Sequence, residues 1–150
     1  MLNPKVVLAP TDFSDAAEGA LETAANVASQ FGATLVLVHV VAALPKLPPD
    51  VSIFKEGDYE LSLQAEATRR IGALSSKYAQ AGISVQIEVG VANDVGMEIV
   101  RIAERHKADL IVIATHGING WKAFAFGSVA EKIIRSTPSA VLLIKIPKGK

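Results

Sequence analysis

The chain contains no cysteine, which excludes disulfide bonds and thiolate metal sites and is typical of a reducing compartment. Its fifteen basic and fifteen acidic side chains cancel, so no overall field attracts nucleic acid or an anionic membrane. No apolar run approaches the ~20 residues of a membrane-spanning helix, and the first residues lack the basic and apolar blocks of a secretion signal. We therefore expect a cytoplasmic protein with no nucleic-acid or membrane partner.

The chain also lacks the two strongest phosphate-binding motifs. There is no Gly-x-x-x-x-Gly-Lys-Ser/Thr, which brings a lysine to the terminal phosphates, and no Gly-x-Gly-x-x-Gly after the first strand. The histidines His39, His106 and His116 are scattered, with no acidic neighbour or second histidine at metal-ligand spacing. No nucleophile–base pair stands out. We expect no metal site built from protein side chains alone, and at most slow hydrolysis of a bound nucleotide.

What is present is an alternation of strand and helix patterns. Five runs rich in β-branched residues predict strands over 6–9, 34–38, 84–89, 110–113 and 140–144. Four are continuously hydrophobic, as in strands covered on both faces, whereas 84–89 alternates and predicts an edge strand. Helical periodicity predicts helices over about 17–31, 58–81 and 95–106, and from 128 to before Pro138. This order predicts a three-layer α/β/α fold, doubly wound around a five-stranded parallel sheet, in a single domain over 1–150.

Local signals mark some of the boundaries. Ser14 is expected to cap the first helix and Gly32 to end it. Between residues 44 and 57, three prolines and the lack of any periodicity predict a mobile surface loop.

The candidate site follows from this topology. In an open α/β sheet, ligands bind beyond the carboxyl ends of the strands, where the strand order reverses. The loops expected there are 9–14, after the first strand, and 114–128, after the fourth. The second carries Gly117, Gly120 and Gly127 ahead of a helix. Glycine backbone can approach an anion closely, and a helix start offers unpaired donors and a positive dipole end. This pattern predicts a phosphate-bearing small molecule.

The same residues also have purely structural interpretations. Asp12 could simply help to cap the first helix. Ser128 and Glu131 fit a Ser-x-x-Glu capping box that needs no ligand, and the loop glycines could serve turns alone. The residue pattern by itself leaves both interpretations open.

Four segments, in order, resemble the universal stress protein family along nearly the whole chain. They are Val7-Leu8-Ala9-Pro10-Thr11-Asp12-Phe13-Ser14, Leu37-Val38-His39-Val40, Thr115-His116-Gly117 with Gly127-Ser128-Val129-Ala130-Glu131, and Pro138-Ser139-Ala140-Val141-Leu142-Leu143-Ile144. The ATP-binding members carry Gly-x-x-Gly, nine residues, then Gly-Ser/Thr. This chain has the same spacing but begins the motif with Ala114, where those members have glycine.

The resemblance implies a strand order of 3-2-1-4-5, in an adenine nucleotide alpha hydrolase-like fold. It implies binding of ATP or another adenine nucleotide, with Mg²⁺, in a stress-response or signalling role. Asp12 would contact the ribose or act through a metal, the Val40 backbone would meet the adenine edge, and the second loop would hold the phosphates. The expected contacts are Pro10, Thr11, Asp12, Val40, Ala114, His116, Gly117, Gly127, Ser128 and Val129.

The resemblance further implies a homodimer paired through the last strand, Ala140 to Ile146. This hydrophobic strand would otherwise be an exposed sheet edge, which gives pairing a physical motive. Ala114 favours an alternative, in which the protein binds no nucleotide and works as a dimeric scaffold for other proteins.

Overall fold

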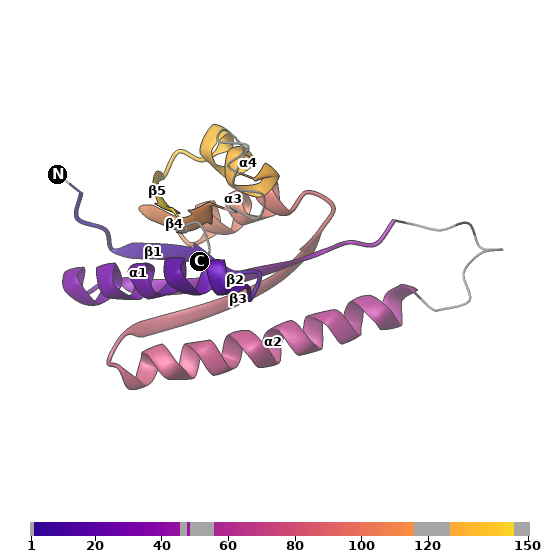
Figure 1. Ribbon diagram of the computed structural model, residues 1–150, viewed down its shortest axis with the longest axis horizontal. Helices are drawn as coiled ribbons and strands as arrows, with labels where there is room; N and C mark the ends of the chain where they lie inside the picture. The colour runs from indigo at the N-terminus through magenta and orange to yellow at the C-terminus, as the bar shows by residue number, and fades with distance from the viewer. Residues whose placement is uncertain (1, 46–47, 49–55, 116–126, 146–150) are drawn as a thin grey trace, which may run out of the picture.

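Five parallel strands form one sheet in the order β3-β2-β1-β4-β5 (Figure 1). The computed structural model describes residues 2–45, 48, 56–115 and 127–145. The strands are β1 (Val6–Pro10), β2 (Thr34–Ala42), β3 (Ser84–Ala92), β4 (Leu110–Thr115) and β5 (Ala140–Lys145). The helices are α1 (Asp15–Phe31), α2 (Glu56–Gln80), α3 (Val95–Arg105) and α4 (Ser128–Ser136). The predicted fold class and strand order are confirmed, and β3 is an edge strand as its alternating pattern indicated.

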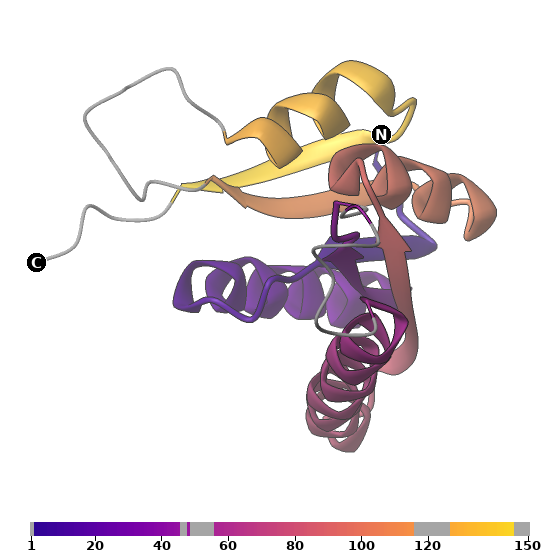
Figure 2. The ribbon, with the colours of Figure 1, turned by 90° about the vertical axis from the view of Figure 1, so that its right-hand side faces the viewer.

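Helices cover both faces of the sheet, α1 and α2 on one side and α3 and α4 on the other (Figure 1; Figure 2). Successive side chains of a strand point to opposite faces. Along β2, Leu35 and Leu37 accordingly pack with α1 and α2, whereas Val36 and Val38 pack with α3 and α4. Each central strand therefore contributes to two apolar cores, which explains its continuous hydrophobic run.

The helix ends follow local side-chain chemistry. Ser14 caps α1 as expected, and Gly32 ends it in a left-handed conformation with φ 63°. Asp94, which no sequence pattern marked, caps α3 by accepting from the Met97 N–H. α2 begins at Glu56, two residues before the predicted start, so the end of the expected proline-rich loop is helical. Most of that loop, 46–47 and 49–55, lies outside the described residues.

Within the ranges that the structure describes, no helix is long and apolar enough to cross a membrane.

Candidate functional site

The sheet opens at its carboxyl edge between the two central strands. Within the described residues, β1 pairs with β4 only at Val7–Leu110 and Leu8–Ile111, although β4 continues to Thr115. After β1 the chain enters α1 on one face of the sheet, and after β4 it reaches α4 on the other face. The two strand ends therefore separate at the point where a doubly wound sheet commonly binds its ligand.

A cavity of about 120 Å³ lies at this point. Apolar side chains of β2, α3, β4 and α4 form much of its wall. Gly127 and Ser128 stand at the start of α4, directly before a lining residue. His116 and Gly117 lie outside the described residues. Six of the predicted contact residues line the cavity: Pro10, Thr11, Asp12, Val40, Ala114 and Val129.

Val40 presents its backbone beyond the end of β1. The carbonyl of Val38 accepts a hydrogen bond from the N–H of Thr11 (2.8 Å), so Val38 directs its polar backbone groups toward β1. Alternate residues of a strand face the same neighbour, and β1 ends at Pro10, opposite Val38. The N–H and C=O of Val40 therefore point past the last residue of β1.

Asp12 supports the start of α1 and lines the cavity at the same time. Its Oδ1 accepts hydrogen bonds from the backbone N–H (2.9 Å) and the hydroxyl of Ser14. Ser14 in turn accepts from the N–H of Ala17 (3.2 Å). Asp12 therefore helps to cap α1, through Ser14. A carboxylate in the cavity wall also suits a hydroxyl donor or a cation.

His39 is a lining residue that the sequence patterns did not predict. Its Nδ1 lies 2.7 Å from the carbonyl oxygen of Thr11. Because a carbonyl can only accept, Nδ1 carries a proton, and Nε2 is an acceptor when the ring is neutral. The ring also packs against Phe13, with the centroids 4.6 Å apart. The available signal was its position near the carboxyl end of a buried strand, the edge where ligands bind.

The capping-box interpretation of Ser128 and Glu131 is wrong. The N-cap of α4 is Gly127, Ser128 is the first helical residue, and no side chain caps the helix. Gly127 adopts φ 56° and ψ 148°, a combination largely restricted to glycine, and its carbonyl accepts from the Glu131 N–H (3.0 Å). The first turn of α4 therefore offers backbone donors and a positive dipole end.

Ala114 lines the cavity but directs its methyl group toward the α1–α2 layer. Along β4, Ile111 and Ile113 pack in the α3–α4 core, whereas Val112 and Ala114 pack against the α1–α2 core. Val129, at the start of α4, packs against the α3–α4 core. An anion at the N-terminus of α4 would approach from that opposite face. The methyl group of Ala114 therefore need not crowd it.

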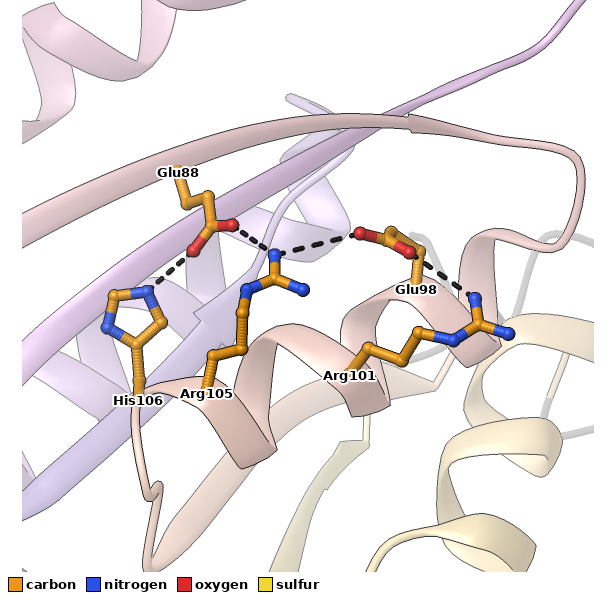
Figure 3. A network of polar contacts seen from close by, with 5 residues as sticks. All are labelled: Glu88, Glu98, Arg101, Arg105 and His106. Carbon is orange, nitrogen blue, oxygen red and sulfur yellow. Dashed lines mark hydrogen bonds and ion pairs between the residues drawn. The ribbon is translucent and has the colours of Figure 1, made fainter.

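A second group of polar side chains joins β3 to α3 outside the cavity lining (Figure 3). The Glu88 carboxylate accepts from Arg105 and lies 2.6 Å from Nε2 of His106, while Arg105 also pairs with Glu98 at 3.7 Å. Burial raises the pKa of Glu88, but the hydrogen bonds from Arg105 and His106 outweigh it and bring this pKa below its usual value. The sequence shows no acidic neighbour of His106 at metal-ligand spacing, and its acidic partner, Glu88, instead comes from β3.

No metal centre arises from this group. Among the residues with described positions, no three or more His, Asp or Glu side chains are arranged to hold a metal ion. Glu88 and His106 instead join an edge strand to the helix that covers it.

Comparison with known proteins gives a consistent family assignment. A model of the universal stress protein family matches residues 4–145. The universal stress protein MJ0531 of Methanocaldococcus jannaschii is 34% identical over 149 residues, covering 96% of this chain and 84% of that protein. The solved structure of the hypothetical protein MJ0577, from the same organism, is 27% identical and covers 99% of this chain and 100% of its own, with a TM-score of 0.83. The fold is thus adenine nucleotide alpha hydrolase-like, as expected.

Two more distant structures of the same fold are nucleotide complexes. A universal stress protein from Archaeoglobus fulgidus in complex with dAMP is 24% identical, with a TM-score of 0.66, and covers 97% of this chain and 100% of its own. A universal stress protein in complex with cAMP is 21% identical, with a TM-score of 0.60, and covers 95% of this chain and 98% of its own.

Proposed function

The chain belongs to the universal stress protein family, and from this premise we propose that its strand-end cavity binds an adenine nucleotide in a stress-response or signalling role. The observation that carries the proposal is the meeting, at one cavity, of Asp12 after β1, Val40 of β2, Ala114 of β4 and Val129 of α4. Adenine nucleotides in two other structures of this fold support the ligand class.

The parts of the nucleotide divide among these elements. The base lies against the apolar walls, with its polar edge on the backbone of Val40. Asp12 meets the ribose, or a Mg²⁺ ion that arrives with the phosphates, because Mg²⁺ is usually bound by phosphates and few carboxylates. The phosphates lie at the first turn of α4, near Gly127 and Ser128. The cavity is smaller than the ~300–1,000 Å³ typical of small-molecule pockets, so it encloses the base and leaves the phosphates at its mouth.

The direct test is to look for the nucleotide itself. Mass spectrometry of small molecules released from purified, denatured protein identifies a co-purified nucleotide. Calorimetry then measures the affinities of ATP with Mg²⁺, dAMP and cAMP. We expect a saturable heat with at least one of them. The absence of both a co-purified nucleotide and any heat at millimolar ligand would refute the proposal.

Asp12→Asn isolates the role of the carboxylate charge. Asparagine keeps an Oδ1 acceptor for the Ser14 N–H, so the start of α1 is preserved. We expect affinity for Mg²⁺-ATP to fall roughly tenfold, ~1.4 kcal/mol. Asp15→Asn is the matched control, because Asp15 lies in the first turn of α1 and does not line the cavity. Equal affinities in the two variants would show that Asp12 does not contact the ligand.

Ser128→Ala separates ligand binding from helix capping. Because the side chain of Ser128 makes no capping bond, its loss should change the free energy of unfolding by less than ~0.5 kcal/mol. Loss of a hydrogen bond to a charged phosphate should weaken ATP binding by about tenfold or more. Denaturant unfolding and calorimetry on the same protein make the comparison. A destabilised variant with normal affinity would instead restore the capping interpretation.

We further propose that two copies pair through β5. It is an edge strand, and Leu142 on it is 38% exposed; Ile146, the last residue of the predicted dimer strand, lies outside the described residues. Charged side chains oppose pairing at sheet edges. Leu142→Lys should therefore give a monomer by light scattering. Ile87→Lys is the matched control on β3, the other edge strand, where Ile87 is 41% exposed. A dimer that dissociates with Ile87→Lys but not with Leu142→Lys would indicate an interface at β3 instead.

The small size of the cavity favours one alternative, a dimeric scaffold that acts through other proteins without a nucleotide. The two functions are separated by the nucleotide measurements above. A dimer that releases no nucleotide and binds none would support the scaffold.

A further inference from the structure

Arg70 of α2 lies near enough to the Glu66 carboxylate to help lower its pKa, but it is not bonded to it. Arg70 makes no hydrogen bond or ion pair with any described residue, whereas its neighbour Arg69 is paired with Glu66 at 2.6 Å. The Arg70 guanidinium lies over the face of Phe13, whose ring centroid is 4.3 Å from Cζ. A guanidinium over an aromatic ring keeps its N–H donors for an oxyanion, which it can bind in a bidentate manner.

Two hollows meet at Arg70. One lies between α1 and α2 and has a volume of about 440 Å³. The other lies beside the end of β2 and has a volume of about 340 Å³. Both volumes fall within the ~300–1,000 Å³ range of small-molecule sites. Phe13 and Arg70 line both hollows, so the two residues stand at their junction.

Phe13, the aromatic residue under Arg70, is held in place by its backbone hydrogen bond and its ring contacts. Phe13 has φ 64°, an unfavourable conformation for a residue other than glycine. Its N–H donates to Oγ1 of Thr11 (2.9 Å), and its ring contacts both Arg70 and His39. Strained residues of this kind cluster at binding sites, where surrounding contacts hold them. Thr11 and His39 also line the strand-end cavity, so Phe13 connects the two regions.

The charges around the two hollows differ. The hollow beside β2 is lined by the carboxylates of Asp12 and Glu66 as well as by Arg70. The groove between α1 and α2 is lined by both arginines and a single carboxylate, Glu18. An anion is therefore favoured in the groove, where it meets the N–H donors of Arg70 with less opposing negative charge.

We propose that Arg70 anchors a second binding site, in the α1–α2 groove, for a small metabolite that carries a phosphate or carboxylate group. The site is distinct from the strand-end cavity and does not depend on nucleotide binding there. Its ligand contacts a residue packed on Phe13, and the contact of Phe13 with His39 links the groove to the cavity.

The test is a residue-resolved NMR titration of the full chain with inorganic phosphate and, separately, with acetate, at constant ionic strength. We expect saturable shifts at the Arg70 Nε–H and at the backbone amides of Phe13 and Ser14. Tighter phosphate binding would identify a phosphate ligand, and tighter acetate binding a carboxylate ligand. Shifts that do not saturate for either anion would overturn the proposal. Phosphate bound at Gly127 and Ser128 is distinguished because it shifts those amides instead.

Arg70→Gln should weaken anion binding in the groove by about tenfold or more. Arg70→Lys keeps the charge but loses the bidentate donors of the guanidinium, so its anion affinity should lie between those of the unmodified protein and Arg70→Gln. Arg135→Gln is the matched control, since this exposed arginine of α4 is paired with Glu131 and lines neither hollow; its affinity should stay within about twofold of the unmodified protein. Spectra with unchanged dispersion confirm folding. An affinity in Arg70→Gln equal to that in Arg135→Gln would overturn the proposal.

Discussion

Removing one buried oxygen should make this protein more stable. Tyr78 of α2 is 5% exposed within the α1–α2 core, and its hydroxyl has no hydrogen-bond partner among the described residues. Leaving a buried hydroxyl unpaired costs ~1–3 kcal/mol. Tyr78→Phe removes that oxygen and keeps the ring, including its contact with Lys77 at 5.3 Å. We expect a gain of about 1 kcal/mol, or ~2–4 °C in Tm for a chain of this size.

High pH provides an independent check of the same environment. Burial raises the pKa of Tyr78, and the carboxylates of Glu22 and Glu18 raise it further. The unfolded chain releases the tyrosine proton near pH 10, whereas the folded chain still holds it. The stability that this proton contributes is complete below pH 10 and is lost as the pH rises through the folded pKa. Phenylalanine has no such proton, so the advantage of Tyr78→Phe should widen above pH 10.

The assay is urea unfolding at neutral pH and again above pH 10. Tyr59→Phe is the control, because Tyr59 is 52% exposed and water already solvates such a hydroxyl; its stability should change by less than ~0.5 kcal/mol. A loss of stability in Tyr78→Phe, with Tyr59→Phe unchanged, would mean that the Tyr78 hydroxyl is hydrogen-bonded, and would refute the reasoning.

Three further predictions concern the site and the packing around it. Ala114→Gly should change ATP affinity by no more than about threefold, ~0.6 kcal/mol, by calorimetry, because the methyl group faces the α1–α2 core. Gly96→Ala should destabilise by ~1–3 kcal/mol in urea, since the added Cβ would lie 2.8 Å from Cβ of Lys132, whereas Gly72→Ala has open space and should stabilise by ~0.5–1 kcal/mol. Glu88→Gln should cost up to about 1 kcal/mol at pH 7. Because the folded pKa of Glu88 is lowered, that cost should shrink as the pH falls below about 4.5. Urea unfolding of both proteins at a series of pH values measures this change.

Much of the fold could be predicted because its signals are local. Buried parallel strands need continuous apolar runs, and crossover helices need one apolar stripe, so both can be recognised from the order of residues in the sequence. Ser14 and Gly32 act on their own helix ends and were predicted correctly. The alternation of polar and apolar residues in β3 correctly predicted an edge strand with one solvent-exposed face.

Sequence patterns missed contacts between distant segments and misplaced one helix start. His106 has no acidic neighbour in the sequence, and its partner Glu88, 18 residues away, reaches it from β3. Ser128 and Glu131 match a capping box, but the helix begins one residue too early for it, with Gly127 as the N-cap. His39 gave no motif of its own, and its contact with Thr11 exists only because β1 and β2 lie side by side.

The family, the order of the elements and the residues that follow each strand can be inferred from the amino-acid sequence alone. Hydrophobic period and the short motifs at the strand ends are enough for this, because each acts within a few neighbouring residues. Three features required the folded chain: which strand ends diverge, the packing of the Ala114 methyl group against the α1–α2 core, and the position of Arg70 over Phe13. These depend on sheet register and helix packing, which join segments far apart in the chain.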